Sequence, residues 1–231
     1  MRALVIAAHP DDEVLGAGGT IAAMSAAGVD TTVLIVAEGV SLRHTEVSLD
    51  RARATCRAAG RVLGVDDIRF GGLATDGTLI GDGPQSAVVS LVREVVDDVQ
   101  PALVLTHHAG DIHVDHRVVA RSVEYVTRAM AGGPVRKVLH FEVLSSSEQQ
   151  TGQTTPFVPN VFHDIAAFVE RKCEALAVYD YEIFDGPHPR SAHGVRALAG
   201  YRGVTLGVTA AEAFVLGREF RDAAAWTGGA L

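Results

Sequence analysis

The sequence predicts an α/β fold: a Rossmann-like, mostly parallel sheet with helices on both faces. Short apolar runs alternate with longer segments of helical periodicity through the first two-thirds of the chain. This alternation is typical of a parallel sheet whose crossover helices cover both faces. Gly and Pro residues separate the segments and mark the turns. With 231 residues and 48% hydrophobic content, the chain can form one large domain, residues 1–231.

The expected elements begin with a strand over residues 3–8, which stops at Pro10 because proline cannot donate to a sheet ladder. A helix over residues 14–27 ends at Gly28, and β-branched residues favour a second strand over 31–37. Further helices are expected at residues 47–63, 86–99, 115–130, 166–179 and 191–201, and further strands at 68–70, 102–106, 138–143, 161–165 and 211–220. Residues 38–45, 71–84 and 145–159 are expected to form loops.

The composition of the chain indicates which kinds of partner it can bind and in which cellular compartment it is expected. The net charge is -8 and no basic stripe occurs, which argues against nucleic-acid or anionic-membrane binding. Cys56 and Cys173 lie outside any C-x-x-C motif, as expected in a reducing cytosol. No run approaches the roughly 18 apolar residues of a membrane span, and the N-terminal run is too short for a signal peptide, so we expect a cytoplasmic location. Lys137 and Lys172 are the only lysines, which suggests a GC-rich bacterial genome.

An acidic turn, His9-Pro10-Asp11-Asp12-Glu13, joins the first expected strand to the first expected helix. Ligands bind at this edge of open α/β sheets, beyond the carboxyl ends of the strands. Consecutive carboxylates at a turn point in different directions, so one can bind a cation beside His9 while the other addresses whatever the cation activates. A catalytic zinc site needs both roles: side chains that bind the ion, and a base within reach of the coordination position left open for water. The plainer alternative is an acidic helix start favoured by the helix dipole.

A second polar cluster follows the fourth expected strand and contains His113, Asp115 and His116. A parallel sheet brings the ends of both strands to one edge, so the two clusters are expected to meet. Two imidazoles and one carboxylate with an open fourth position form a catalytic zinc pattern, although iron and other divalent ions also accept such ligands. We expect one Zn²⁺ per chain. His107 and His108 are consistent with late strand positions, a polar rim or contacts to substrate.

A dinucleotide-binding domain is the rival interpretation, suggested by Gly16, Gly18 and Gly19 and by Glu38 as a ribose partner. The G-x-G-x-x-G spacing fails because Ile21 stands where the third glycine is needed. The acidic turn would also repel a pyrophosphate. We therefore interpret the glycines as sites of close helix packing.

The chain resembles the LmbE/PIG-L family of zinc-dependent deacetylases that act on N-acetylated sugars. The resemblance extends from the first strand to about Phe220. It rests on residues 9–13 (HPDDE), 106–111 (THHAGD), 115–117 (DHR), 159–162 (PNVF), 164–165 (DI), 188–191 (HPRS), 202–203 (RG) and 211–214 (AEAF). The chain departs from the family pattern at Val114, where a proline is frequent, and at Thr55, where a glutamate is expected.

The resemblance implies a role for each residue of the two clusters. His9, Asp12 and His116 would hold the zinc ion, and Asp11 would be the general base. His113 would stabilise the oxyanion or protonate the departing amine, and Asp115 would orient a histidine. The reaction would remove the N-acetyl group from an N-acetylglucosamine-type sugar or glycoconjugate and release acetate and a free amine.

Four residues are expected to contact this small-molecule substrate: Arg43, Asp76, His188 and Arg190. The alternative for each is a solvated loop charge or a structural turn. Two other functions stay open, namely a metal-dependent hydrolase of another amide or ester and a non-catalytic zinc- or sugar-binding protein. Members of the family often form homo-oligomers, so the resemblance also implies that option for this chain.

Overall fold

The computed structural model describes residues 1–39, 46–75, 80, 85–129, 133–152 and 155–221. Within these residues, the strands are β1 (Arg2–Ala7), β2 (Asp30–Ala37), β3 (Asp67–Leu73), β4 (Leu103–His107), β5 (Lys137–Phe141), β6 (Val161–Asp164) and β7 (Ala211–Glu219). The helices are α1 (Asp12–Ala26), α2 (Leu49–Leu63), α3 (Gln85–Val99), α4 (Val114–Val126), α5 (Val169–Ala177) and α6 (Ala192–Val204), with a short 3₁₀ turn η2 (Ser147–Gln149).

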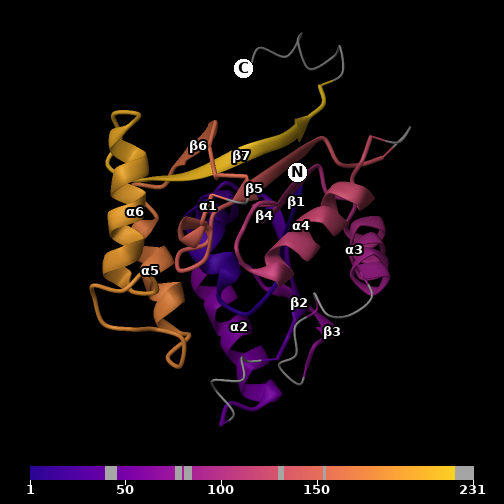
Figure 1. Cartoon of the computed structure of the whole chain (residues 1–231), viewed down its shortest axis with the longest axis horizontal. Helices are drawn as coiled ribbons and strands as arrows, with labels where there is room; N and C mark the ends of the chain where they lie inside the picture. Colours follow the sequence, from indigo (N-terminus) through magenta and orange to yellow (C-terminus); the bar gives the residue numbers. More distant parts are fainter. Residues whose placement is uncertain (40–45, 76–79, 81–84, 130–132, 153–154, 222–231) are drawn as a thin grey trace.

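The strands form one sheet in the order β3-β2-β1-β4-β5-β7-β6 (Figure 1). The first five are mutually parallel, and β7 runs antiparallel to both of its neighbours. Two apolar clusters lie on opposite faces of the sheet, one shared with α1, α2 and α5 and the other with α3 and α4. The expected fold class, a mostly parallel α/β sheet with helices on both faces, is confirmed.

Most element boundaries differ by one to four residues from those expected from the sequence, and the ends of α4 and β3 are two examples. The helix expected over residues 115–130 ends at Val126, because side chains bind its last carbonyl groups: the Thr127 hydroxyl donates to the carbonyl of Val123 and Arg218 donates to that of Thr127. The loop expected from residue 71 onwards begins later, since β3 continues to Leu73.

Helix α1 packs closely on its neighbours through its glycines. A Cβ atom at Gly16 would overlap the ring of Phe141, and one at Gly19 would lie 2.7 Å from Cδ1 of Ile165. The backbone of α1 is also fixed by a buried ion pair between Lys172 and Glu212 (2.6 Å). Glu212 accepts from two backbone N–H groups of α1, and Lys172 donates to the carbonyl oxygen of Leu15. These contacts set the position of α1, whose first turn carries the acidic residues.

The order of the strands creates a switch point between β1 and β4. These adjacent parallel strands send their chains to opposite sides, β1 towards β2 and β4 towards β5. The two connections diverge beyond the carboxyl ends of the strands, where open α/β sheets bind ligands. Among the described residues, no helix combines the length and the apolar character needed to cross a bilayer.

We predict that Gly16→Ala lowers the free energy of unfolding by about 1–2 kcal/mol, because overlap with the ring of Phe141 outweighs the gain in helix propensity. Gly200→Ala in α6 is the matched control, since its Cβ would meet open space. The free energy of unfolding of that variant should rise by about 0.5–1 kcal/mol. Urea unfolding of both variants checks the pair, and equal effects would contradict the packing role of Gly16.

Candidate functional site

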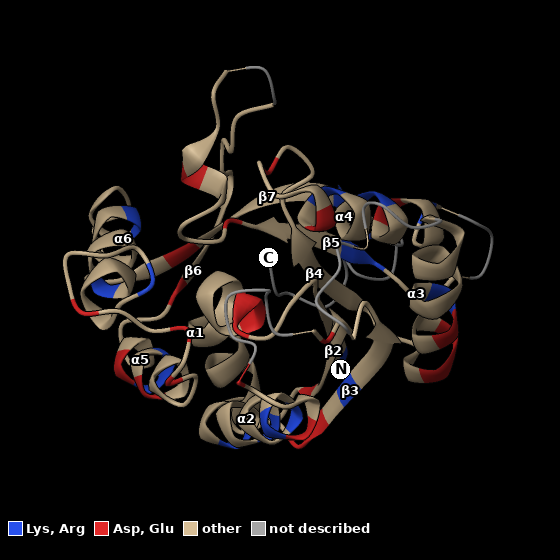
Figure 2. Ribbon diagram, turned by 60° about the horizontal axis from the view of Figure 1, so that its bottom comes forward, with Lys and Arg blue, Asp and Glu red and all other residues tan. Residues whose placement is uncertain are grey.

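The two polar clusters meet at the switch point, where His116 contacts Asp12 and Asp115 contacts His9. In Figure 2 the acidic start of α1 lies near the centre of the view. Asp11 and Asp12 lie on the turn after β1, and His113 and His116 lie at the start of α4 after β4. Asp11 is the N-cap residue of α1 and lies in the left-handed region, with φ at 91°, although its side chain makes no capping hydrogen bond. A non-glycine residue in this conformation costs on the order of 1–3 kcal/mol, and such strain concentrates at functional sites. The turn thereby directs the two carboxylates differently.

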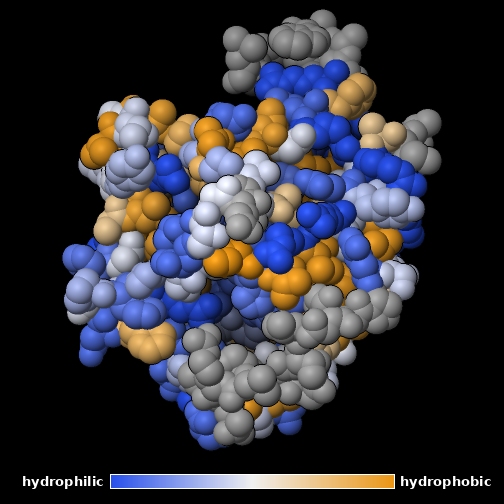
Figure 3. All heavy atoms as spheres, in the orientation of Figure 1, coloured by the Kyte–Doolittle hydropathy of each residue, from blue (hydrophilic) through white to orange (hydrophobic). Residues whose placement is uncertain are grey.

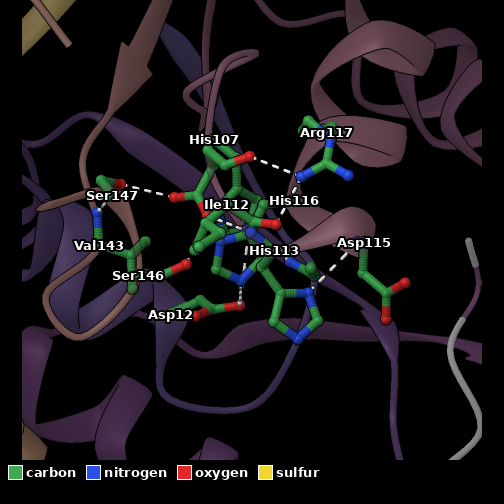
Figure 4. Close-up of polar contacts among 12 residues, drawn as sticks. Asp12, His107, Ile112, His113, Asp115, His116, Arg117, Val143, Ser146 and Ser147 are labelled. Carbon is green, nitrogen blue, oxygen red and sulfur yellow. Dashed lines mark hydrogen bonds and ion pairs between the residues drawn. The ribbon is translucent and has the colours of Figure 1, made fainter. Parts of the chain in front are cut away.

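Asp12 lies between two imidazoles. Its Oδ2 atom is 3.3 Å from Nδ1 of His9 and 3.2 Å from Nε2 of His116. All three side chains come from the turn after β1 and the start of α4, and Asp12 and His116 are almost fully buried (Figure 4). Burial alone would raise the pKa of Asp12, but the neighbouring histidines, with His116 first, hold it well below its usual range. Asp12 is therefore a buried anion that requires positive charge beside it.

A carboxylate lies beside the far nitrogen of each imidazole, hydrogen-bonded to His9 and at ion-pair distance from His116. Nε2 of His9 lies 2.9 Å from Oδ2 of Asp115, and Nδ1 of His116 lies 3.3 Å from Oδ1 of Asp111. An imidazole that donates its N–H to a carboxylate presents its other nitrogen as a lone pair. This arrangement directs Nδ1 of His9 and Nε2 of His116 towards Asp12. Asp115 lies where the sequence analysis expected a residue that orients a histidine.

Two pairs of these donor atoms have the separation that a tetrahedral metal ion requires. Bonds of about 2.0–2.1 Å in a tetrahedron place neighbouring ligands about 3.3–3.4 Å apart, close to the two separations measured here. The site also attracts positive charge without a metal. Burial would lower the pKa of His116, but Asp12 and Asp111 raise it to about 10, so a proton is held where a cation would bind.

His107 also lies within reach of this centre. The donor atoms of Asp12, His107 and His116 lie within 4.8 Å of one another, as do those of His9, His113 and His116. However, the backbone N–H of Ala8 donates to Nε2 of His107 at 2.7 Å. That hydrogen bond occupies the lone pair that a metal ion would need. We infer that His107 supports the turn after β1 and that His9 supplies the second imidazole ligand.

Asp11 points away from the imidazoles towards Arg190. Its Oδ2 atom lies 3.4 Å from Nη1 of Arg190, which also contacts Glu182 at 2.8 Å. No described residue donates a hydrogen bond to this Oδ2 atom. Burial raises the pKa of Asp11 well above its usual range, although Arg190 opposes the shift. A buried carboxylate with a raised pKa and an oxygen that accepts no hydrogen bond from a described residue is suited to accept a proton.

His113 is held in one tautomer. Its Nδ1 atom accepts from the backbone N–H of Asp115 at 3.2 Å, so the proton of the neutral ring lies on Nε2. Burial, followed by the charges of His116 and His9, lowers the pKa of His113 to about 4. At neutral pH the ring is thus an uncharged donor, and it lies beside His9 and His116 with ring centroids 4.8 and 4.7 Å away.

Asp111 lies at the candidate site, although the sequence analysis did not single it out. It accepts hydrogen bonds from the hydroxyl groups of Ser146 and Ser147 and from the backbone N–H of His113. Burial would raise its pKa, but His116 and the two serines lower it. Its position inside the second cluster was the available signal; its partner could be found only in three dimensions.

The four expected substrate contacts have different outcomes. Arg43 and Asp76 lie outside the described residues. Arg190 reaches the site through Asp11 and also donates to the hydroxyl of Ser145 at 2.7 Å. His188 lies near the same turn, where its ring packs on Phe184 with centroids 4.1 Å apart. Figure 3 shows a hollow in the face of the molecule at this edge of the sheet.

The sequence of the chain matches the family model described as PIG-L: GlcNAc-PI de-N-acetylase over residues 4–127. That match covers both polar clusters and more than half of the chain. The chain belongs to the PIG-L family. The family resemblance stated from the motifs is thereby confirmed.

Curated relatives of this PIG-L family member are named as sugar deacetylases. The 1D-myo-inositol 2-acetamido-2-deoxy-alpha-D-glucopyranoside deacetylase of Actinosynnema mirum is 33% identical over 65% of the chain, and the match spans only 62% of that relative's length. The probable N-acetyl-alpha-D-glucosaminyl L-malate deacetylase 2 of Bacillus anthracis is 28% identical over 76% of the chain and 79% of the relative.

Solved structures share the fold at lower identity. The conserved protein TT1542 from Thermus thermophilus has a TM-score of 0.73 at 26% identity, covering 96% of the chain and 97% of that protein. The N,N'-diacetylchitobiose deacetylase from Pyrococcus horikoshii has a TM-score of 0.71 at 20% identity, covering 93% and 83%. A 4-carboxy-2-hydroxymuconate hydratase from Pseudomonas putida has a TM-score of 0.73 at 20% identity, covering 96% and 98%. The fold therefore serves more than one chemistry, and the site must decide the reaction.

We predict that His9→Ala and His116→Ala each weaken binding of a divalent metal ion by more than about 100-fold, because each removes a ligand. His107→Gln should keep the affinity within a few-fold, since the amide oxygen can accept the N–H of Ala8 in place of the ring. Competition with a chromogenic chelator measures the affinities, with the exposed His193→Ala as the control. Equal losses in the folded His107 and His116 variants would contradict this ligand assignment.

Proposed function

We propose that the chain is a zinc-dependent hydrolase that removes the N-acetyl group from an N-acetylglucosamine-type sugar or glycoconjugate. The observation that carries this proposal is the separation of two consecutive carboxylates: Asp12 lies between the imidazoles of His9 and His116, while Asp11 lies beside Arg190 with one oxygen that accepts no hydrogen bond from a described residue. A binding protein would need the first arrangement, whereas a hydrolase needs both. The names of the curated relatives support the sugar and the bond that is cleaved.

The proposed ligands are Nδ1 of His9, Oδ2 of Asp12 and Nε2 of His116. Bound zinc would polarise the acetyl carbonyl and lower the pKa of a coordinated water molecule towards about 7. We choose zinc over iron because three N and O donors with one open position are typical of catalytic zinc sites. Asp115 and Asp111 keep the two imidazoles in the orientation that the ion requires.

The side chains around this centre divide the remaining chemistry. Asp11 accepts the proton of the attacking water, and Arg190, whose Nη1 atom lies 3.4 Å from Oδ2 of Asp11, holds that carboxylate in place. His113 donates from Nε2 to the oxygen of the acetyl group as negative charge develops there. Asp11 then carries the proton that the departing amine takes up. Acetate and a free amino sugar are the products.

We predict that Asp11→Asn retains the metal ion and lowers kcat for acetate release by about 10²–10⁴-fold, because asparagine tolerates the left-handed conformation but cannot accept the proton. Acetate release from a panel of N-acetylglucosaminyl conjugates, together with metal content, is the measurement. Asp98→Asn, which removes an exposed carboxylate on α3, is the control for charge. Full turnover by the Asp11 variant would remove it from the role of base.

We predict that His113→Ala lowers kcat by about 10²–10³-fold with little change in KM, because the lost donor acts mainly on the transition state. The metal content should stay at that of the unaltered protein, since His113 is not a proposed ligand. Steady-state kinetics with metal analysis separates the two effects. Loss of the ion from this variant would place His113 among the ligands.

Acetate release also separates this function from the alternatives. A hydrolase of another amide or ester would bind zinc with the same residues and release no acetate from N-acetyl sugars. A non-catalytic zinc- or sugar-binding protein would bind both without turnover. A non-catalytic protein would need neither the buried carboxylate of Asp11 nor the oriented donor on His113.

A further inference from the structure

A cavity of about 440 Å³ lies at the opposite edge of the sheet from the candidate site. Its walls come from the carboxyl ends of α3 and α4, the segment before β5 and the last residues of β7. β5 begins at Lys137, which pairs with Glu219 at the end of β7, so this is the amino edge of the parallel strands. The cavity shares no residue with the two polar clusters, and its volume is in the range of small-molecule sites.

Four arginines line this cavity: Arg93, Arg128, Arg136 and Arg218. The lining carboxylate is Asp97, which leaves a formal charge of +3 on a chain whose net charge is -8. Within the described part of the chain, no carboxylate lies within ion-pair distance of any of the four guanidinium groups. Figure 3 shows strongly hydrophilic atoms gathered beside the end of β7. The net acidity of the protein makes this local excess of positive charge notable.

The end of α4 accounts for only part of this charge. Arg218 donates to the carbonyl of Thr127, and Arg128 donates to that of Tyr125 at 2.6 Å. Cations are favoured there by the helix dipole, and each guanidinium keeps further N–H donors. Arg93 makes no hydrogen bond to another described residue, and Arg136 donates to the carbonyl of Gly133 at 3.5 Å and lies over the ring of Phe220. Both side chains are exposed, so their charges can reach a ligand.

The rest of the wall is apolar and includes an aromatic ring. The guanidinium of Arg136 lies over the ring of Phe220, 5.2 Å from its centroid. Val96, Val126 and Pro134 extend the apolar surface. A ligand that complements both the arginines and the apolar wall of the cavity carries several negative charges at one end and a planar or apolar group at the other.

We propose that this cavity is a binding site for an organic phosphate of the nucleoside diphosphate class. Such a molecule carries about three negative charges at neutral pH, which matches the formal charge of the lining residues. Guanidinium groups bind phosphate oxygens through paired N–H donors, and the base would pack on the apolar wall beside Phe220. The site is independent of the proposed deacetylation, since the two lie at opposite edges of the sheet.

The test is isothermal titration calorimetry of the full chain with adenosine diphosphate, and separately with pyrophosphate and with adenosine. We expect one binding site per chain for adenosine diphosphate, with an affinity that falls as salt rises and at least about tenfold weaker binding of each probe that carries half of the molecule. Arg93→Gln with Arg136→Gln should weaken adenosine diphosphate by at least about tenfold, because both lose a cation that faces the cavity.

The matched control is Arg61→Gln with Arg171→Gln, which removes the same charge from α2 and α5, away from the cavity. This pair should bind adenosine diphosphate as the unaltered chain does. The proposal is overturned if adenosine diphosphate does not bind at millimolar concentration, or if both double variants weaken it equally. Equal affinity for pyrophosphate and adenosine diphosphate would overturn the assignment of a nucleoside. Circular dichroism and thermal unfolding of the variants establish that they are folded.

Discussion

The buried carboxylate of Asp12 is the constraint on which the rest of the site depends. An ionised carboxylate away from water requires positive charge and hydrogen bonds around it. Its neighbours supply both: the backbone N–H of His9 donates to it, and two imidazole nitrogens lie within 3.3 Å. Those imidazoles are in turn oriented by Asp111 and Asp115. Two histidines thus face Asp12, and each has a second carboxylate on its other side. The start of a helix does not need this arrangement, whereas a bound cation does.

The fold makes this arrangement possible by bringing two distant segments to one place. β1 and β4 are neighbours at the switch point, so the turn after β1 and the start of α4 face each other across the edge of the sheet. Close packing at Gly16 and the buried ion pair between Lys172 and Glu212 fix the position and orientation of α1 on the sheet. The left-handed conformation of Asp11 then turns its carboxylate away from that of Asp12. The packed core offsets the free-energy cost of this strained conformation.

Sequence patterns predicted the sheet, its helices and the meeting of the two clusters because these follow from hydrophobic periodicity and from the geometry of parallel strands. They did not reveal the partnership of Asp111 with His116, or the contact between Arg190 and Asp11, because both depend on side-chain directions after the chain has folded. The same limit applies to His107. In sequence it is one more histidine, and only the hydrogen bond from Ala8 separates it from the ligands.

The most direct measurement of the central claim is a crystal structure of the zinc-loaded protein with anomalous data collected at the zinc absorption edge. The account predicts one anomalous peak per chain, bonded to Nδ1 of His9, Oδ2 of Asp12 and Nε2 of His116, with Asp11 facing the open coordination position and not bonded to the ion. A peak bonded to His107, or no peak between β1 and α4, would contradict it.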